Sequence, residues 1–276
     1  MAPYLWVWKL MNCTIGRIVS KEWVEQKFEG IIPEATKQKH EFAIFGIETY
    51  EIHFIMMLHL RGFSMGLGPY THASESSFGS IPTMEYNWNV NFPRYVDDMA
   101  RKHMIFHGNE NGAKRLFIKG HFLGGAEALR KKYPDADFFT VIRPPHQVVQ
   151  SFINFIQCME LDGMVGKMPW KNNIIYLTLD QVRYFKEEKE WYEKEDGANK
   201  LVVRFSDYVK DLEGTMKVIY KHVMNGREVP DYIPKEHPPR DRKNYLVNRS
   251  LEVMGVSEKG LREELPEYYA WVENKQ

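Results

Sequence analysis

The sequence contains little cysteine: among its 276 residues there are only Cys13 and Cys158. Two thiols are too few for a disulfide framework or a multi-cysteine zinc site, so we expect no metal and slightly favour a reducing, cytoplasmic location. The sequence also has no uninterrupted apolar run of about 18 residues, so we expect no membrane span. Glycosylation sequons begin at Asn12 and Asn248, but this short pattern is common by chance and leaves the compartment undecided.

An excess of charge of either sign is also lacking, because 37 Lys and Arg residues balance 37 Asp and Glu residues. Nucleic acid is therefore not an expected partner, since no overall positive potential would attract it. A small anionic ligand needs only a locally basic pocket and stays compatible with this balance. With 43% hydrophobic and 27% charged residues, the composition is that of a globular protein rather than a disordered one.

Residues 1–110 are expected to be mostly helix and loop. An apolar-rich run from Glu41 to Leu60 predicts a long helix. The segment 61–91 is rich in glycine and proline and predicts an irregular loop region. A helical pattern resumes from Arg94 to His107.

Residues 111–225 predict an α/β part, and residues 226–276 predict carboxyl-terminal helices. Strands separated by a crossover helix imply a parallel sheet. Thr178 and Gln181 match a capping box, which predicts a helix that begins there and runs to about Glu195. The expected strands are 115–119, 137–142 and 199–205, and the other expected helices are 123–133, 145–160 and 207–222.

One spacing within this part points to a phosphate ligand. Arg143 ends an apolar strand, and Ser151 follows about two turns into the next helix. Open α/β sheets bind ligands at the carboxyl ends of their strands, and helix amino termini favour anions. A guanidinium makes bidentate bonds to phosphate oxygens, and a serine hydroxyl adds another donor.

Three blocks in order resemble the sulfotransferase family. The first, Arg115–Phe155, contains YPDADFFTVIRPPHQVVQSF, which looks like the segment that holds the 3′-phosphate of 3′-phosphoadenosine 5′-phosphosulfate. The second is LVVRFSDYVKDLEGTMKVIYKHV at Leu201–Val223, and the third is NYLVNRSLEVMGVSEKGLREELPEYYAWVE at Asn244–Glu273. The resemblance implies a single domain over 1–276, with a P-loop-like three-layer fold in which helices flank a parallel sheet.

By this resemblance, the chain would transfer a sulfuryl group from that donor to a hydroxyl or amine on a small molecule, glycan or peptide. Arg143 and Ser151 would bind the 3′-phosphate. Phe205 would lie near the adenine, where many members have tyrosine. Lys119 matches the lysine of a motif resembling "LKSPEH", although Gly120 and His121 replace its Ser-Pro pair, and it would contact donor or substrate oxygens.

The family's loop for the 5′-phosphosulfate, commonly resembling Pro-Lys/Arg-Ser-Gly-Thr-Thr, is not found in this sequence. The sheet is accordingly expected to be incomplete on its amino-terminal side. This leaves open the alternative of a non-catalytic sulfotransferase-fold remnant, or of a truncated product that lacks an amino-terminal segment, acting as a protein that binds a partner. A P-loop kinase relative ranks last, since the sequence lacks Gly-x-x-x-x-Gly-Lys-Ser/Thr.

The general base, the acceptor and the oligomeric state are also open. Sulfuryl transfer needs a group that takes the acceptor's proton, usually a histidine or a carboxylate. The acceptor would be selected by the loop region 61–93. The candidates for the base are Glu48, Glu51, His53, His59 and His121.

Overall fold

The computed structural model divides the chain into two compact units, 1–132 and 133–276, and each is described by itself. This division falls inside the segment 111–225 that the sequence predicts as one α/β part, and the single domain stays a prediction. The structure describes residues 86–104, 116–118, 123–161, 170–194, 197, 199–224, 226–231, 233–237 and 245–274.

Apart from residues 116–118, the described part of the first unit is helical. A π-helical turn, η4 (Asn87–Asn91), leads into α6 (Phe92–His103), and α8 (Leu123–Lys132) packs against both. The helix predicted from Arg94 begins two residues earlier than expected, because Pro93 occupies its first turn, a position that proline favours. The helix predicted at 123–133 is confirmed.

Glycine allows α8 to approach α6 closely. A Cβ atom on Gly125 would lie 2.2 Å from Cδ1 of Phe92, a separation that packed atoms do not tolerate. The rings of Trp88 and Phe92 meet edge to face, with their centroids 5.2 Å apart. The aromatic side chains of η4 and α6 therefore pack directly against the backbone of α8.

The strand predicted at 115–119 does not appear in the described residues. Residues 116–118 lie in neither a helix nor a strand, and Arg115 and Lys119 lie outside the described residues. The helix predicted from Glu41 to Leu60 also lies outside the described residues.

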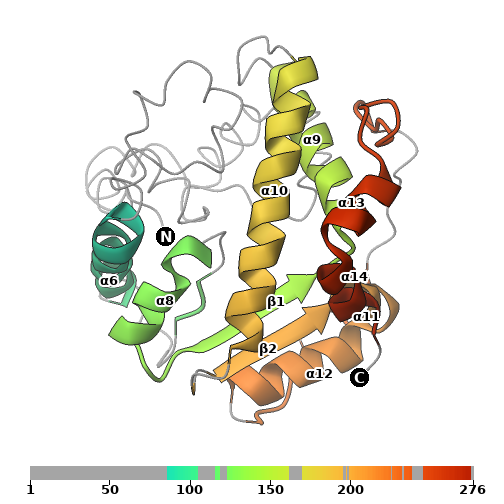
Figure 1. Ribbon diagram of the computed structural model, residues 1–276. Coiled ribbons are helices and arrows are strands. Elements are labelled where there is room, and N and C mark those ends of the chain that lie inside the picture. The colour runs from blue at the N-terminus through green and yellow to red at the C-terminus, as the bar shows by residue number, and fades with distance from the viewer. Residues whose placement is uncertain are drawn as a thin grey trace, which may run out of the picture. The chain divides into compact units, whose positions relative to one another are not determined.

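The second unit is an α/β unit built on two parallel strands, β1 (Asp137–Ile142) and β2 (Asn199–Arg204). Asp137 pairs with Asn199, and the register runs to Ile142 opposite Arg204, so both strands end at the same edge (Figure 1). The prediction of two parallel strands here is confirmed. The second ends one residue earlier than predicted, because Phe205 already begins a helix.

The two longest described helices of the second unit pack on each other. Helix α9 (Pro145–Leu161) follows β1 and confirms the helix predicted at 145–160. Helix α10 (Trp170–Glu193) packs on α9 and contacts β2. Figure 1 shows α10 as a long helix whose own carboxyl end lies near the sheet.

The capping box predicted at Thr178 is wrong. Thr178 lies inside α10, eight residues after its first residue, and its hydroxyl donates to the carbonyl of Ile174 at 2.7 Å. The helix begins eight residues earlier because its first turns carry apolar side chains that pack in the core, among them Ile174 and the fully buried Leu177. Burial of that face decides the helix start here.

The single helix predicted at 207–222 is two helices, α11 (Phe205–Lys210) and α12 (Leu212–Val223). The chain bends at Asp211, whose carboxylate accepts a hydrogen bond from the amide of Gly214 at 2.7 Å. Aspartate at this position satisfies one of the amides that a helix start leaves unbonded. The short α11 thus turns the chain directly after β2.

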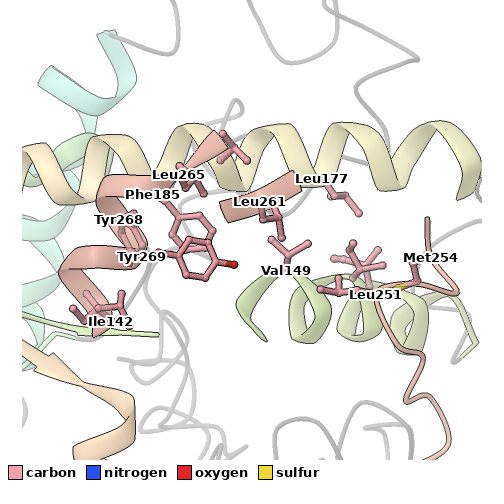
Figure 2. Close-up of a cluster of buried hydrophobic side chains, with 14 residues drawn as sticks. Ile142, Val149, Leu177, Phe185, Leu251, Met254, Leu261, Leu265, Tyr268 and Tyr269 are labelled. Atoms are coloured by element: carbon pink, nitrogen blue, oxygen red, sulfur yellow. The ribbon is translucent and has the colours of Figure 1, made fainter. Parts of the chain in front are cut away.

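The carboxyl-terminal segment is less helical than predicted. Residues 245–257 form turns and irregular structure, followed by α13 (Glu258–Glu264) and α14 (Pro266–Glu273). Together with α9 and α10, these two helices enclose the main core (Figure 2). The labelled core residues are Ile142, Val149, Leu177, Phe185, Leu251, Met254, Leu261, Leu265, Tyr268 and Tyr269.

Within the described residues, none of the helices is both long enough and apolar enough to cross a membrane.

Candidate functional site

The predicted ligand residues Arg143 and Phe205 meet at the carboxyl edge of the sheet. Arg143 directly follows β1, and Phe205 directly follows β2, so the register of the strands brings them together. The guanidinium carbon of Arg143 lies 4.6 Å from the centre of the Phe205 ring. Stacking uses the flat face of the guanidinium, whereas its N–H groups lie in the plane, so stacking and anion binding do not compete.

Gln147 orients the same guanidinium. The Nε of Arg143 donates to the side-chain oxygen of Gln147 at 2.8 Å. Gln147 and Ser151 are four residues apart on α9 and so share a face, with their Cβ atoms about 6 Å apart. Ser151 is exposed. Ser151 therefore lies one turn beyond Gln147, on the face of α9 whose first turn bonds to Arg143.

The backbone amides at the start of α9 are already bonded. Pro145 has no N–H, and the amide of His146 donates to the hydroxyl of Tyr269 at 3.2 Å. The amides of Gln147 and Val148 donate to the carbonyl of Pro144 at 2.9 and 3.3 Å. An anion bound at this turn must therefore be contacted by side chains, chiefly by the guanidinium of Arg143, rather than by backbone amides. The helix dipole adds a weaker attraction.

An aromatic row continues from Phe205 along α11. The rings of Phe205 and Tyr208 lie three residues apart with centroids 6.2 Å from each other, and Tyr208 packs edge to face on His237 at 4.6 Å. The Nε2 of His237 lies 2.7 Å from the carbonyl oxygen of Tyr208. Because a carbonyl only accepts, Nε2 carries the hydrogen, and His237 holds the loop after α12 against α11.

The start of α9 is fastened to α14 by His146 and Tyr269. Besides accepting from the backbone amide of His146, the hydroxyl of Tyr269 lies 3.1 Å from Nδ1 of the same residue. The two rings are nearly parallel, with centroids 5.9 Å apart. Figure 2 shows the Tyr269 hydroxyl pointing toward the first turn of α9.

Charged side chains of α13 and α14 surround this contact. Arg262 lies over the Tyr269 ring at 4.2 Å and donates to Glu258 and Glu273, each at 2.8 Å. The hydrogen bond from Arg262 lowers the pKa of Glu273. Burial lowers the pKa of His146, which Glu258 partly opposes, while the charges of Arg262 and Arg143 lower it further.

A second arginine at this edge has a structural role that sequence reasoning missed. Arg204, the last residue of β2, donates to the carbonyl oxygens of Val272 and Asn274 at the carboxyl end of α14, at 3.1 and 2.5 Å. A cation at this end of a helix also interacts favourably with its dipole. Arg204 thus attaches α14 to the sheet edge beside Phe205.

The sequence predictions for this site have different outcomes. Arg143, Ser151 and Phe205 are described, and the contact between Arg143 and Phe205 brings two of them together. Lys119 lies outside the described residues, so its role stays a prediction. The candidates for the general base, Glu48, Glu51, His53, His59 and His121, also lie outside the described residues.

Residues that sequence reasoning did not identify complete the edge. Gln147 could have been found, because it lies in the first turn of the predicted helix and close in sequence to Arg143. Tyr269 lies 123 residues from His146, and no local pattern connects them. Three or more His, Cys, Asp or Glu side chains do not gather into a possible metal site anywhere in the part of the chain that the structure describes.

Comparison of the chain with protein-family models, curated protein sequences and solved structures finds no match.

Proposed function

We propose that the carboxyl edge of β1 and β2 binds the 3′-phosphoadenosine part of 3′-phosphoadenosine 5′-phosphosulfate, and that the chain is a sulfotransferase-like protein. The proposal rests on one observation above all. Arg143 and Phe205, which the resemblance assigns to the 3′-phosphate and the adenine, follow adjacent parallel strands and lie in contact. The resemblance alone is a matter of sequence spacing, whereas this contact is independent of it.

The chemistry of the edge is compatible with such a ligand. The guanidinium of Arg143 is oriented by Phe205 on its face and by Gln147 at its Nε, which lowers the entropy cost of binding an anion. The exposed hydroxyl of Ser151 adds a donor along the same helix face. We assign the 3′-phosphate to Arg143 and Ser151, and the adenine to the neighbourhood of Phe205.

In the proposed reaction, the oxygen or nitrogen of the acceptor forms a bond to sulfur as the bond between sulfur and the bridging oxygen of the donor breaks. Adenosine 3′,5′-bisphosphate leaves with that oxygen, and a base takes the proton of the acceptor. Positioning and charge stabilisation supply most of the catalysis in transfers of this type. The proposed fold is the P-loop-like three-layer arrangement of this family, to which Lys119 would contribute a cation.

Binding without transfer is the second candidate function. It is favoured by the sequence, which contains no segment resembling Pro-Lys/Arg-Ser-Gly-Thr-Thr for the 5′-phosphosulfate. In that case the edge would bind adenosine 3′,5′-bisphosphate or a similar anion as a recognition event. Sulfuryl transfer from the donor to an acceptor by the purified chain would reject this candidate.

The test is calorimetric titration of the chain with adenosine 3′,5′-bisphosphate, with 5′-AMP as the ligand that lacks the 3′-phosphate. We expect Arg143→Ala to weaken binding by roughly 10- to 100-fold, the value of a charge-assisted hydrogen bond. Ser151→Ala should weaken it less. Arg183→Ala is the matched control, because Arg183 is exposed on α10 and pairs with Asp180 of its own helix.

Circular dichroism of each variant shows whether the protein is folded. Equal affinity for both nucleotides, or equal affinity of the Arg143→Ala variant and the original chain, would contradict the proposed site.

A further inference from the structure

His146 is the titratable side chain nearest in sequence to the proposed anion contact. It lies three residues after Arg143, in the first turn of α9. Each element packed around it presents charged or titratable groups: Arg143 follows β1, α13 presents Glu258 and Arg262, and α14 presents Tyr269 and Glu273. The Nδ1 of His146 lies 3.5 Å from a carboxylate oxygen of Glu258.

The Tyr269 hydroxyl determines which tautomer the neutral His146 ring adopts. It accepts from the backbone amide of His146, so its own hydrogen is available for the Nδ1 atom at 3.1 Å. A hydroxyl has one hydrogen and two lone pairs, so this arrangement satisfies both partners when Nδ1 is unprotonated. The neutral ring then carries its hydrogen on Nε2.

The same geometry accommodates a second state. When Nδ1 gains a proton, it becomes a donor to the Tyr269 hydroxyl and faces the Glu258 carboxylate. Burial and the positive charges of Arg262 and Arg143 oppose this protonation and lower the pKa of His146, whereas Glu258 and Glu273 favour it. A bound anion at Arg143 would neutralise one of the opposing charges.

We propose that anion binding at Arg143 and proton uptake by His146 are coupled, so that protonation of His146 strengthens anion binding at this edge. The identity of the ligand rests on the proposed function above, and the coupling itself rests on the place of His146 in the first turn of α9, three residues after Arg143, and on its contact with Glu258. Coupling is reciprocal by thermodynamic necessity: the proton strengthens anion binding by the factor by which the anion strengthens proton binding. His146 acts here as a positioning residue that also carries a titratable charge.

The coupling is tested first by binding. The full chain and a His146→Gln variant are titrated with adenosine 3′,5′-bisphosphate at about pH 7.5 and about pH 5.5, the range over which imidazole titrates. Glutamine can still accept from the Tyr269 hydroxyl but cannot gain a charge. For each protein, the affinity at the lower pH is divided by the affinity at the higher pH. We expect this ratio to be roughly fivefold larger in the original chain than in the variant.

Comparison with the variant also cancels the effect of the ligand's own titration. The 3′-phosphate titrates near pH 6 and loses charge as the pH falls. This loss affects both proteins equally, so the difference between them belongs to His146. Equal pH dependence in the two proteins would overturn the proposal.

A second measurement needs no nucleotide. NMR titration of the His146 ring in the full chain and in Arg143→Gln should show a higher midpoint in the variant, because one opposing charge is removed. Glu258→Gln should lower the midpoint. Unchanged midpoints would overturn the coupling. Absence of nucleotide binding at both pH values would contradict the proposed function, and the NMR comparison would then decide the coupling alone.

Discussion

The hydroxyl of Tyr268 on α14 donates a hydrogen bond to the carboxyl group of Glu188 on α10, at 2.6 Å. The other carboxyl oxygen of Glu188 accepts from Thr140 of β1 at 2.7 Å. Glu188 is only 5% exposed, so this one side chain joins a strand and two helices in the interior. Burial raises the pKa of Glu188, and the two hydroxyl donors oppose that rise.

Glu188 should make the stability of the second unit depend on pH. The folded state holds a proton on Glu188 more tightly than the unfolded state does, because the pKa is raised from 4.5. Its stabilising contribution is therefore complete below pH 4.5 and is lost as the pH rises through the higher folded pKa. Glu188→Gln mimics the protonated group and should lack this loss. Urea denaturation of both proteins across this window measures the difference, and parallel stability curves would contradict it.

Asn154 connects α9 to the segment after residue 245 and should be sensitive to a single-atom change. Its amide donates to the carbonyl of Arg249 at 2.9 Å and accepts from the amide of Arg249 at 2.8 Å. Asn154→Asp replaces the donor with a buried acceptor that faces a carbonyl. We expect a loss of about 1–3 kcal/mol or more in the free energy of unfolding, measured by chemical denaturation.

The control for Asn154 is Gln150→Ala. Gln150 also donates to the Arg249 carbonyl, at 3.1 Å, but this bond is exposed and leaves the backbone amide of Arg249 bonded to Asn154. We expect a smaller loss of stability. A larger loss for Gln150→Ala than for Asn154→Asp would show that the amide pair of Asn154 does not hold this segment.

Gly125 is required by the close approach of α8 and α6. In a solvent-exposed helix, alanine would be favoured over glycine by about 1 kcal/mol. Here a Cβ would lie 2.2 Å from Phe92, so we expect Gly125→Ala to destabilise the first unit by about 1–3 kcal/mol. Phe92→Leu should relieve part of this effect, and a thermal-denaturation cycle of the single and double variants measures the coupling. Additive effects would contradict direct contact.

Local patterns predicted the elements that present the site. The apolar run at 137–142 and the proline at position 145 predict β1 and α9 correctly, because both signals depend on neighbouring residues. The break at Asp211 also has a local signal, since aspartate three residues before Gly214 is a common helix start. That signal competes with the helical periodicity on either side of it, and the periodicity suggested one continuous helix.

Contacts between distant segments could not be predicted in this way. The start of α10 is decided by burial of Ile174 and Leu177 against other helices, and the competing cap signal at Thr178 is stronger in the sequence. Arg204 lies about 70 residues from the carbonyl groups that it binds at the end of α14. The contact between Arg143 and Phe205 is partly predictable, because it follows once the parallel pairing and register of the two strands are known.

His146 should give the second unit a pH dependence opposite in sign to that of Glu188. Burial lowers the pKa of His146 below 6.5, so the unfolded state binds the proton more readily than the folded state. The contribution of His146 to stability is therefore complete above pH 6.5 and is lost as the pH falls through the lower folded pKa. Between pH 4.5 and 6.5 the effects of Glu188 and His146 oppose each other, so the original chain alone can show little net change.

Comparison of His146→Gln with the original chain separates the two effects. The original chain should lose stability relative to the variant as the pH falls from about 7 to about 5, the range in which imidazole titrates. A gain in relative stability over that interval would mean that Glu258, rather than burial, dominates the environment of His146.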